Sequence, residues 1–437
     1  MSSYPAHSTT DYVPSAPSRI FYGWWIVLAG TAVFTISSGI GFYGHAVFLD
    51  PLQKQYGWSK GVVSTAMTLY FAVSGIMGIF ISRPIDRYGA RPVIVIGSIC
   101  FGLALMLLSS IKTVTHLYAV YIFMSVGWAA ISIIPVSTLI TNWFVRRRGF
   151  AMSITMMGLS LGGVVMVPFA THLVSQWGLR FVLFILGVLL WMVVIPLSLL
   201  VFKQRPSDIG QYPDGLPPDM ASGNGSEPPV YFATQMREWT RRRAMKTLSF
   251  WSIVVAFFLV MTGQLAYLTH QISFLSQTLG RTGAAAAVSV TSAASILGRL
   301  VVGMIADRCE KRYVAMGLFL VQVMAILALI SSNHVLILYT GTFVFGLTMG
   351  SILMFQTLLV GECFGIVSFA TVSGIAGVFV HSASAIGPTI AGIIYDLTED
   401  YRIAFSIFAA MTLFAACVII FAKPPEQKTI SLYHSSD

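Results

Sequence analysis

The run AAAAVSVTSAASILGRLVVGMIA, from Ala284 to Ala306, decides the fold class. It contains a single charged residue, Arg299, and roughly 20 mostly apolar residues are enough to cross a bilayer as a helix. The whole chain is similarly apolar, with 56% hydrophobic and 10% charged residues. A soluble domain carries about 25% charged residues, so the composition places this chain in a membrane.

Twelve stretches of this kind follow one another along the chain. They cover residues 21–44, 61–82, 92–111, 116–141, 150–174, 180–203, 248–273, 284–306, 313–331, 335–358, 366–393 and 401–422. Membrane-spanning strands would be about half as long, and a helix satisfies its own backbone hydrogen bonds in hydrocarbon. The sequence therefore predicts an all-α membrane protein with twelve transmembrane helices.

The net charge of +10 follows the expected topology and does not indicate a nucleic-acid surface. With the amino terminus in the cytoplasm, the inner segments hold nineteen Lys and Arg, the outer loops hold six, and Arg299 lies within a span. An excess of Lys and Arg in inner segments is the usual orientation signal. We expect a multi-pass protein of the cell membrane with both termini in the cytoplasm.

One polar region divides the spans into two sets of six. Residues 204–247 are rich in Pro, Gly, Asp and Ser and end in the basic stretch TRRRAMK, which is typical of a flexible linker. The expected organisation is a cytoplasmic tail at 1–20, a six-helix bundle at 21–203, a cytoplasmic linker at 204–247, a second six-helix bundle at 248–423 and a cytoplasmic tail at 424–437.

The two halves repeat each other at a nearly constant offset. Three residue pairs are 221, 218 and 222 positions apart: Asp86 with Asp307, His116 with His334, and Arg180 with Arg402. This spacing indicates duplication and hence two pseudo-symmetric bundles. Such halves rock around a central site in many secondary transporters.

The loop after the second span resembles the signature of the major facilitator superfamily. In SRPIDRYGARP the signature residues are Asp86, Arg87, Gly89 and Arg91, with Ser82 where the family has its first glycine. The second half keeps Gly303, Asp307 and Arg308 but has Glu310 in place of the later glycine. The resemblance implies a cytoplasmic gate closed by Asp86, Arg87, Arg91, Asp307 and Arg308. The alternative is ordinary turns whose charges only set topology.

Other stretches resemble one branch of that superfamily. They are FYGWWIVLAG in the first span, YGWSKG before the second, NWFVRRRGFAMSI before the fifth and GRLVVGMIAD in the eighth. Together they resemble the monocarboxylate porters and oxalate/formate exchangers. The resemblance implies transport of small organic monocarboxylates, with a proton or counter-anion as the coupled species. An efflux transporter for larger amphipathic compounds and a non-transporting sensor are the alternatives.

Arg299 is the residue that favours an anionic substrate. It lies eight residues before Asp307, or about 12 Å into the membrane at ~1.5 Å per residue. A charge at the centre of a span costs at least ~2.5 kcal/mol, and every Asp and Glu lies in a loop, tail or helix end. The guanidinium therefore lacks a fixed counterion and suits a carboxylate. The alternative is an arginine that bonds backbone carbonyls or extends to the membrane surface.

Further binding residues are expected around Arg299. Thr291, Ser292 and Ser295 continue its helical face. The other candidates lie in the seventh and eleventh spans and are Gln264, Tyr267, His270 and His381, although packing is as plausible a role for any single histidine. Proton-coupled animal members of the branch have an aspartate where this chain has Ser295, so proton coupling would need a histidine or the substrate acid, and anion exchange remains open.

No motif for catalysis or for nucleotide hydrolysis is found. The chain lacks GxSxG, HExxH and P-loop patterns. We therefore expect a non-enzymatic protein without cofactor or metal, whose partners are a small organic anion, a proton or counter-anion, and the lipid bilayer, and not nucleic acid.

Overall fold

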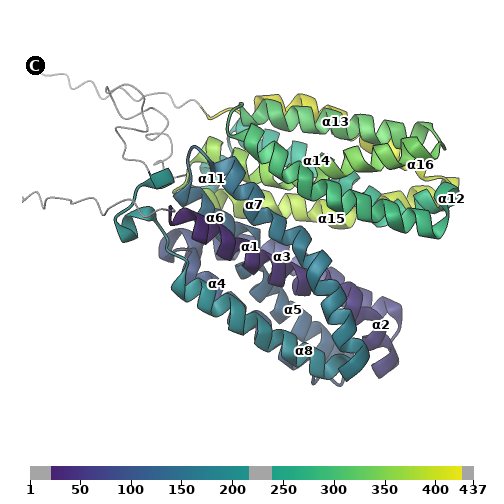
Figure 1. Ribbon diagram of the computed structural model, residues 1–437, viewed down its shortest axis with the longest axis horizontal. Helices are drawn as coiled ribbons and strands as arrows, with labels where there is room; N and C mark the ends of the chain where they lie inside the picture. The colour runs from purple at the N-terminus through teal and green to yellow at the C-terminus, as the bar shows by residue number, and fades with distance from the viewer. Residues whose placement is uncertain (1–20, 216–238, 426–437) are drawn as a thin grey trace, which may run out of the picture.

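The computed structural model describes residues 21–215 and 239–425, and its regular structure over these ranges is helical (Figure 1). The first bundle contains α1 (Gly23–Gly41), α2 (Gly44–Tyr56), α3 (Lys60–Tyr88), α4 (Ala90–Leu108), α5 (Val114–Ile131), α6 (Ile133–Trp143), α7 (Arg148–Leu161), the π-helical turn η1 (Gly162–Met166) and α8 (Val167–Leu200). The second contains α12 (Leu248–Ala306), α13 (Lys311–Ser331), α14 (Val335–Phe364), α15 (Phe369–Thr398), α16 (Tyr401–Val418) and η4 (Ile419–Phe421). Between them lie η2 (Pro206–Ile209), η3 (Pro213–Gly215) and α11 (Arg241–Ala244).

The helices account for twelve membrane crossings. Eleven helical segments of the described residues are long and apolar enough to span a membrane. One of them, Arg148–Leu200, has 53 residues and would be about 80 Å long as one helix, far more than the ~30 Å hydrocarbon core. Gly178, with φ 75°, breaks it into two crossings, as Gly280, with φ 67°, does in α12. The predicted all-α fold with twelve transmembrane helices in two bundles is confirmed.

Two local features differ from the sequence prediction. The segment expected as the first outer loop forms α2, which ends at Gly57 in the left-handed conformation (φ 67°). The predicted fourth span is two helices, α5 and α6, separated at Ser132. Pro135 explains this break, because proline has no N–H for the carbonyl four residues earlier.

Hydrogen bonds identify which helix ends lie together. The Tyr22 hydroxyl at the start of α1 donates to the Val201 carbonyl after α8 at 2.9 Å. The Ser249 hydroxyl at the start of α12 donates to the Lys423 carbonyl after η4. We call this end of the molecule, where residues 201–215 and 239–248 lie, the linker end. The two bundles meet there and diverge toward the opposite end, near α2 and the turn within α12 (Figure 1).

Small residues bring the bundles together near the linker end. The bundles meet through α7 with the second half of α12, and through α3 with α15. A Cβ atom on Gly303 would lie 2.5 Å from Ser153 Cβ, and one on Gly374 would lie 2.6 Å from the Gly78 carbonyl oxygen. Side chains at these glycines would therefore separate the bundles, as expected where helices pack closely in a membrane.

Candidate functional site

Arg299 is fixed from one side by its own bundle. A Cβ on Gly298 would lie 2.0 Å from the Leu347 carbonyl oxygen, and one on Gly350 would lie 2.1 Å from the Ser295 carbonyl oxygen. Only glycine allows α12 and α14 to approach so closely. This approach brings the Gly350 carbonyl to Arg299, whose Nε donates to it at 2.7 Å.

From its other side Arg299 contacts the opposite bundle. Its Nη1 donates to the Ser160 hydroxyl near the end of α7 at 2.6 Å, and the Ser160 and Ser295 hydroxyl oxygens lie 3.5 Å apart. Arg299 is 6% exposed, whereas Leu297, Val301 and Met304 on the other face of the helix are 51%, 51% and 48% exposed. At Ser295 and Arg299 the polar face of this helix therefore lies against the opposite bundle, and the apolar face points outward.

Tyr43 adds a second residue of the first bundle to this site. Its side chain lies close enough to Arg299 to be within reach of the electrostatic field of the guanidinium. A Cβ on Gly163 would lie 3.0 Å from the Tyr43 ring, so glycine in η1 makes room for the ring. A π-helical turn inside an α-helix often marks a functional site. Neither Ser160 nor Tyr43 was predicted from the sequence, where the only signal near Ser160 is the small-residue run SLGG.

Arg299 has neutral ligands within the part of the chain that the structure describes. The ion pairs found there join Lys311 to Glu362 at 2.7 Å and Arg312 to Glu310 at 2.6 Å, both near the linker end. A guanidinium carries five N–H donors, and here two of them bond to an uncharged carbonyl and an uncharged hydroxyl. Its positive charge is left without a carboxylate among the described residues.

Tyr267 and Gln264 lie within the second bundle. The Tyr267 ring packs against Phe345 and Phe405, and its hydroxyl lies 3.5 Å from the Thr342 hydroxyl. Gln264 is buried, and its Oε1 has no hydrogen-bond partner among the described residues. The structure places neither side chain on Arg299.

His270 is likewise bound within the second bundle. Its Nε2 lies 3.1 Å from the Pro388 carbonyl oxygen and its Nδ1 lies 3.1 Å from the Tyr401 hydroxyl. Because a carbonyl only accepts, Nε2 donates, and Nδ1 of the neutral ring accepts from Tyr401. Both ring nitrogens are thus occupied by groups that fix the packing of α12 on α15 and α16.

His381 lies where the bundles face each other. Its Cβ is 3.4 Å from the position that a Cβ on Gly75 would occupy in the opposite bundle, yet the side chain is exposed. Of the two histidines expected near the substrate, His381 is therefore the one that combines an exposed side chain with a place at the bundle interface.

The two signature aspartates join the bundles at the linker end. Asp307, after α12, accepts hydrogen bonds from the N–H groups of Gly149 and Phe150 at the start of α7, at 2.6 and 2.9 Å. Asp86, near the end of α3, accepts one from the N–H of Thr371 at the start of α15 at 3.0 Å. Each carboxylate therefore meets the positive end of a helix dipole in the opposite bundle.

Among the described residues, the contacts found for the signature arginines lie within their own bundle. Arg87 lies over the ring of the adjacent Tyr88, 5.1 Å from its centroid, and Arg308 is exposed. Arg91 donates to the Leu199 carbonyl of its own bundle at 2.5 Å. The two halves therefore make matching contacts, each from an aspartate to the start of a helix in the opposite bundle.

A family model described as the Major Facilitator Superfamily matches residues 31–308 and 271–435. The chain belongs to the major facilitator superfamily. It is a transporter and not an enzyme. Human monocarboxylate transporter 2 is 24% identical over 411 residues, covering 90% of this chain and 84% of that protein. Rat (Rattus norvegicus) monocarboxylate transporter 12 is 24% identical over 433 residues, covering 92% and 86%.

Solved structures of other transporters share the fold. The superfamily transporter FucP in its outward conformation aligns with a TM-score of 0.71 at 13% identity, covering 93% of this chain and 100% of that one. The human organic anion transporter MFSD10 aligns with a TM-score of 0.63 at 14% identity, covering 91% and 98%.

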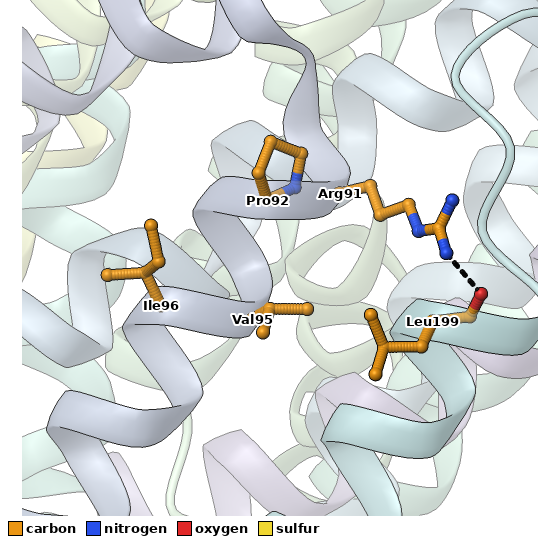
Figure 2. Close-up of a pocket in the computed structure, with 5 residues that line it drawn as sticks. All are labelled: Arg91, Pro92, Val95, Ile96 and Leu199. Carbon is orange, nitrogen blue, oxygen red and sulfur yellow. Dashed lines mark hydrogen bonds between the residues drawn. The ribbon is translucent and has the colours of Figure 1, made fainter.

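A surface pocket of the transporter lies apart from the Arg299 site. It has a volume of about 380 Å³ and is lined by Arg91, Pro92, Val95, Ile96 and Leu199 (Figure 2). These residues belong to the linker-end turns of α4 and α8, and the hydrogen bond from Arg91 to the Leu199 carbonyl joins the two helices there (Figure 2). The pocket lies on α4 and α8, whereas the bundles meet through other helices, α7 with α12 and α3 with α15.

Proposed function

We propose that the transporter moves small organic monocarboxylates across the membrane by alternating access, with Arg299 binding the carboxylate. The observation that carries this proposal is a buried guanidinium between the bundles whose partners, Gly350 and Ser160, are both uncharged. An isolated charge in a low-dielectric interior is costly. A bound anion offsets this cost with charge-assisted hydrogen bonds.

The geometry of Arg299 favours one carboxylate in a defined orientation. Its Nε is committed to Gly350, so the edge formed by the two terminal nitrogens is the one that a substrate can share. A carboxylate matches that edge with two parallel hydrogen bonds. One guanidinium neutralises one carboxylate, which supports a monocarboxylate, the class named by the relatives that are monocarboxylate transporters.

Asp86 and Asp307 are proposed as the gate of the transport cycle. In this structure they join the bundles at the linker end, so opening that end requires both sets of bonds to break. The predicted arginine partners Arg87, Arg91 and Arg308 would set the orientation of the gate by facing lipid headgroups. In the proposed orientation the protein lies in the cell membrane with its linker end facing the cytoplasm. This conformation is then closed to the cytoplasm.

The coupled species is proposed to be a proton or a counter-anion. Ser295 lies beside the Ser160 ligand of Arg299, and neither carries a carboxylate that could exchange a proton with the guanidinium. A proton would then travel on His381 or with the substrate acid, whereas exchange would need only a second anion at Arg299.

Uptake into proteoliposomes tests this function. Purified transporter is reconstituted and supplied with a panel of radiolabelled monocarboxylates, under a proton gradient or with the same acid inside. We expect uptake of at least one acid by the wild type and by Arg242→Ala, which changes an exposed arginine of α11, and none by Arg299→Ala. Equal uptake by Arg299→Ala would contradict the binding role, and transport only of bulky amphipathic compounds would favour the efflux alternative.

A further inference from the structure

The first described part of the linker, which ends at Gly215, is bound to the turn that precedes α7. The Asp214 carboxylate accepts hydrogen bonds from three successive backbone N–H groups, those of Val145, Arg146 and Arg147, at 2.9, 2.7 and 3.4 Å. Asp214 itself has a φ of 58°, a left-handed conformation that Asp and Asn adopt more readily than most residues. One linker side chain thus determines the path of this turn.

The same turn leads directly into the contact between Asp307 and the start of α7, which we call the first joint of the gate. Gly149 and Phe150, which follow it, donate their N–H groups to Asp307 of the second bundle. The charges of Asp214 and Asp307 are close enough to interact. Two carboxylates, one from the linker and one from the second bundle, therefore bind N–H groups on either side of Arg148, the first residue of α7.

The other described end of the linker lies beside the contact between Asp86 and the start of α15, which we call the second joint of the gate. The Trp239 N–H donates to the hydroxyl of Ser368, the residue before α15, at 2.7 Å, and the Trp239 ring packs edge-on against Phe364 at 5.2 Å. Thr371, three residues beyond Ser368, donates to Asp86. This end of the linker is thereby attached to the helix start that Asp86 caps.

Arg241 continues the contact into the first bundle. Its Nη2 donates to the Ile79 carbonyl and, at 3.0 Å, to the Ser82 hydroxyl of α3. Ser82 stands where the superfamily signature has a glycine, so its hydroxyl gives Arg241 an acceptor that glycine lacks. The Arg241 charge also attracts Asp86. Residues 239–241 thus contact both elements of the second joint, α3 and the residue before α15.

We propose that Asp214 and Arg241 are positioning residues of the gate, through which docking of the linker stabilises the state closed at the linker end. Asp214 orients the start of α7 for Asp307, and Arg241 holds the linker across α3 and α15 beside Asp86. This inference rests on the gating role given above to the two aspartates. According to this inference, the linker contacts shift the equilibrium between the closed and open states of the linker end toward the closed state.

A cysteine buried between the bundles reports opening of the linker end. Ser153 of α7 is 0% exposed and packs against Gly303 of α12, so Ser153→Cys introduces a similar side chain that a reagent reaches when the bundles separate. The native cysteines Cys100, Cys309, Cys363 and Cys417 are first replaced by alanine. The labelling rate with a polar maleimide is then measured without substrate.

Matched variants separate the gate-bound residues from their neighbours. Asp214→Asn keeps the left-handed backbone but loses one acceptor and the charge, and Asp208→Asn is its control because Asp208 accepts from the N–H of Arg205 within its own turn. Arg241→Gln is paired with Arg242→Gln at an exposed position. We expect Asp214→Asn and Arg241→Gln each to raise the labelling rate about tenfold, the effect of one charge-assisted hydrogen bond, and the controls to leave it unchanged.

The Asp307→Asn variant distinguishes failure of the inference from failure of the gate. Fast labelling in Asp307→Asn with wild-type rates in both Asp214→Asn and Arg241→Gln would overturn the role of the linker and leave the gate intact. Wild-type rates in all three would overturn both. If either linker variant does not yield monodisperse protein, the other decides the outcome, because the two contacts lie at different joints.

Discussion

The terminal nitrogen Nη1 of Arg299 donates to the hydroxyl of Ser160 at 2.6 Å, and this bond joins the two bundles. Ser160 therefore occupies part of the edge that a substrate carboxylate would use. An anion arriving at Arg299 either shares this hydroxyl or replaces it. Replacement would remove one bond that holds the bundles together near the level of the substrate, so binding and opening would be connected through this pair.

Replacing Ser160 is expected to strengthen anion binding. Ser160→Ala removes the internal ligand that competes for Nη1, and a hydrogen bond to a charged group is worth about 1.5–3 kcal/mol. Part of that energy becomes available to the substrate, so we predict a Kd lower by about tenfold in calorimetry with a transported acid. Ser198→Ala, at a buried serine that bonds the Val194 carbonyl of its own helix, should bind as the wild type does. Weaker binding by Ser160→Ala would show that Ser160 assists the substrate and does not compete with it.

The two histidines are expected to behave differently. His270→Ala leaves the Tyr401 hydroxyl and the Pro388 carbonyl without their partner, at a cost of about 1–3 kcal/mol, so we predict a lower Tm with an unchanged pH profile of uptake. His381→Ala should change the pH profile if proton symport operates, because His381 is exposed at the bundle interface. An altered profile in His270→Ala with an unaltered one in His381→Ala would reverse these roles.

The gate is expected to tolerate loss of one joint better than loss of both. Asp86→Asn and Asp307→Asn each weaken the linker-end closure at a different pair of helices, and the two contacts have no hydrogen-bond partner in common. We predict that each single variant retains reduced uptake and that the double variant loses nearly all of it. Uptake equal to wild type in the double variant would remove the gating role.

The sequence predicted features that depend on local pattern and composition. Twelve apolar spans follow from length and hydropathy, and the outward apolar face of Leu297, Val301 and Met304 follows from helical periodicity. The sequence could not predict that Ser160 meets Arg299, because that contact depends on how two helices from different bundles are placed along each other. The contact of Asp214 with residues 145–147 was missed for the same reason, since a short polar run carries no sign of the surface on which it docks.

Calorimetric titration of the purified transporter with small monocarboxylates examines the role of Arg299 without the complications of transport. We predict measurable binding by the wild type and by Arg242→Ala. Arg299→Ala should bind at least about tenfold more weakly, and Arg299→Lys should recover little of the loss because an ammonium lacks the planar fork. Binding by Arg299→Ala with the wild-type Kd, in folded and monodisperse protein, would contradict the proposal that a buried, uncompensated guanidinium holds the substrate.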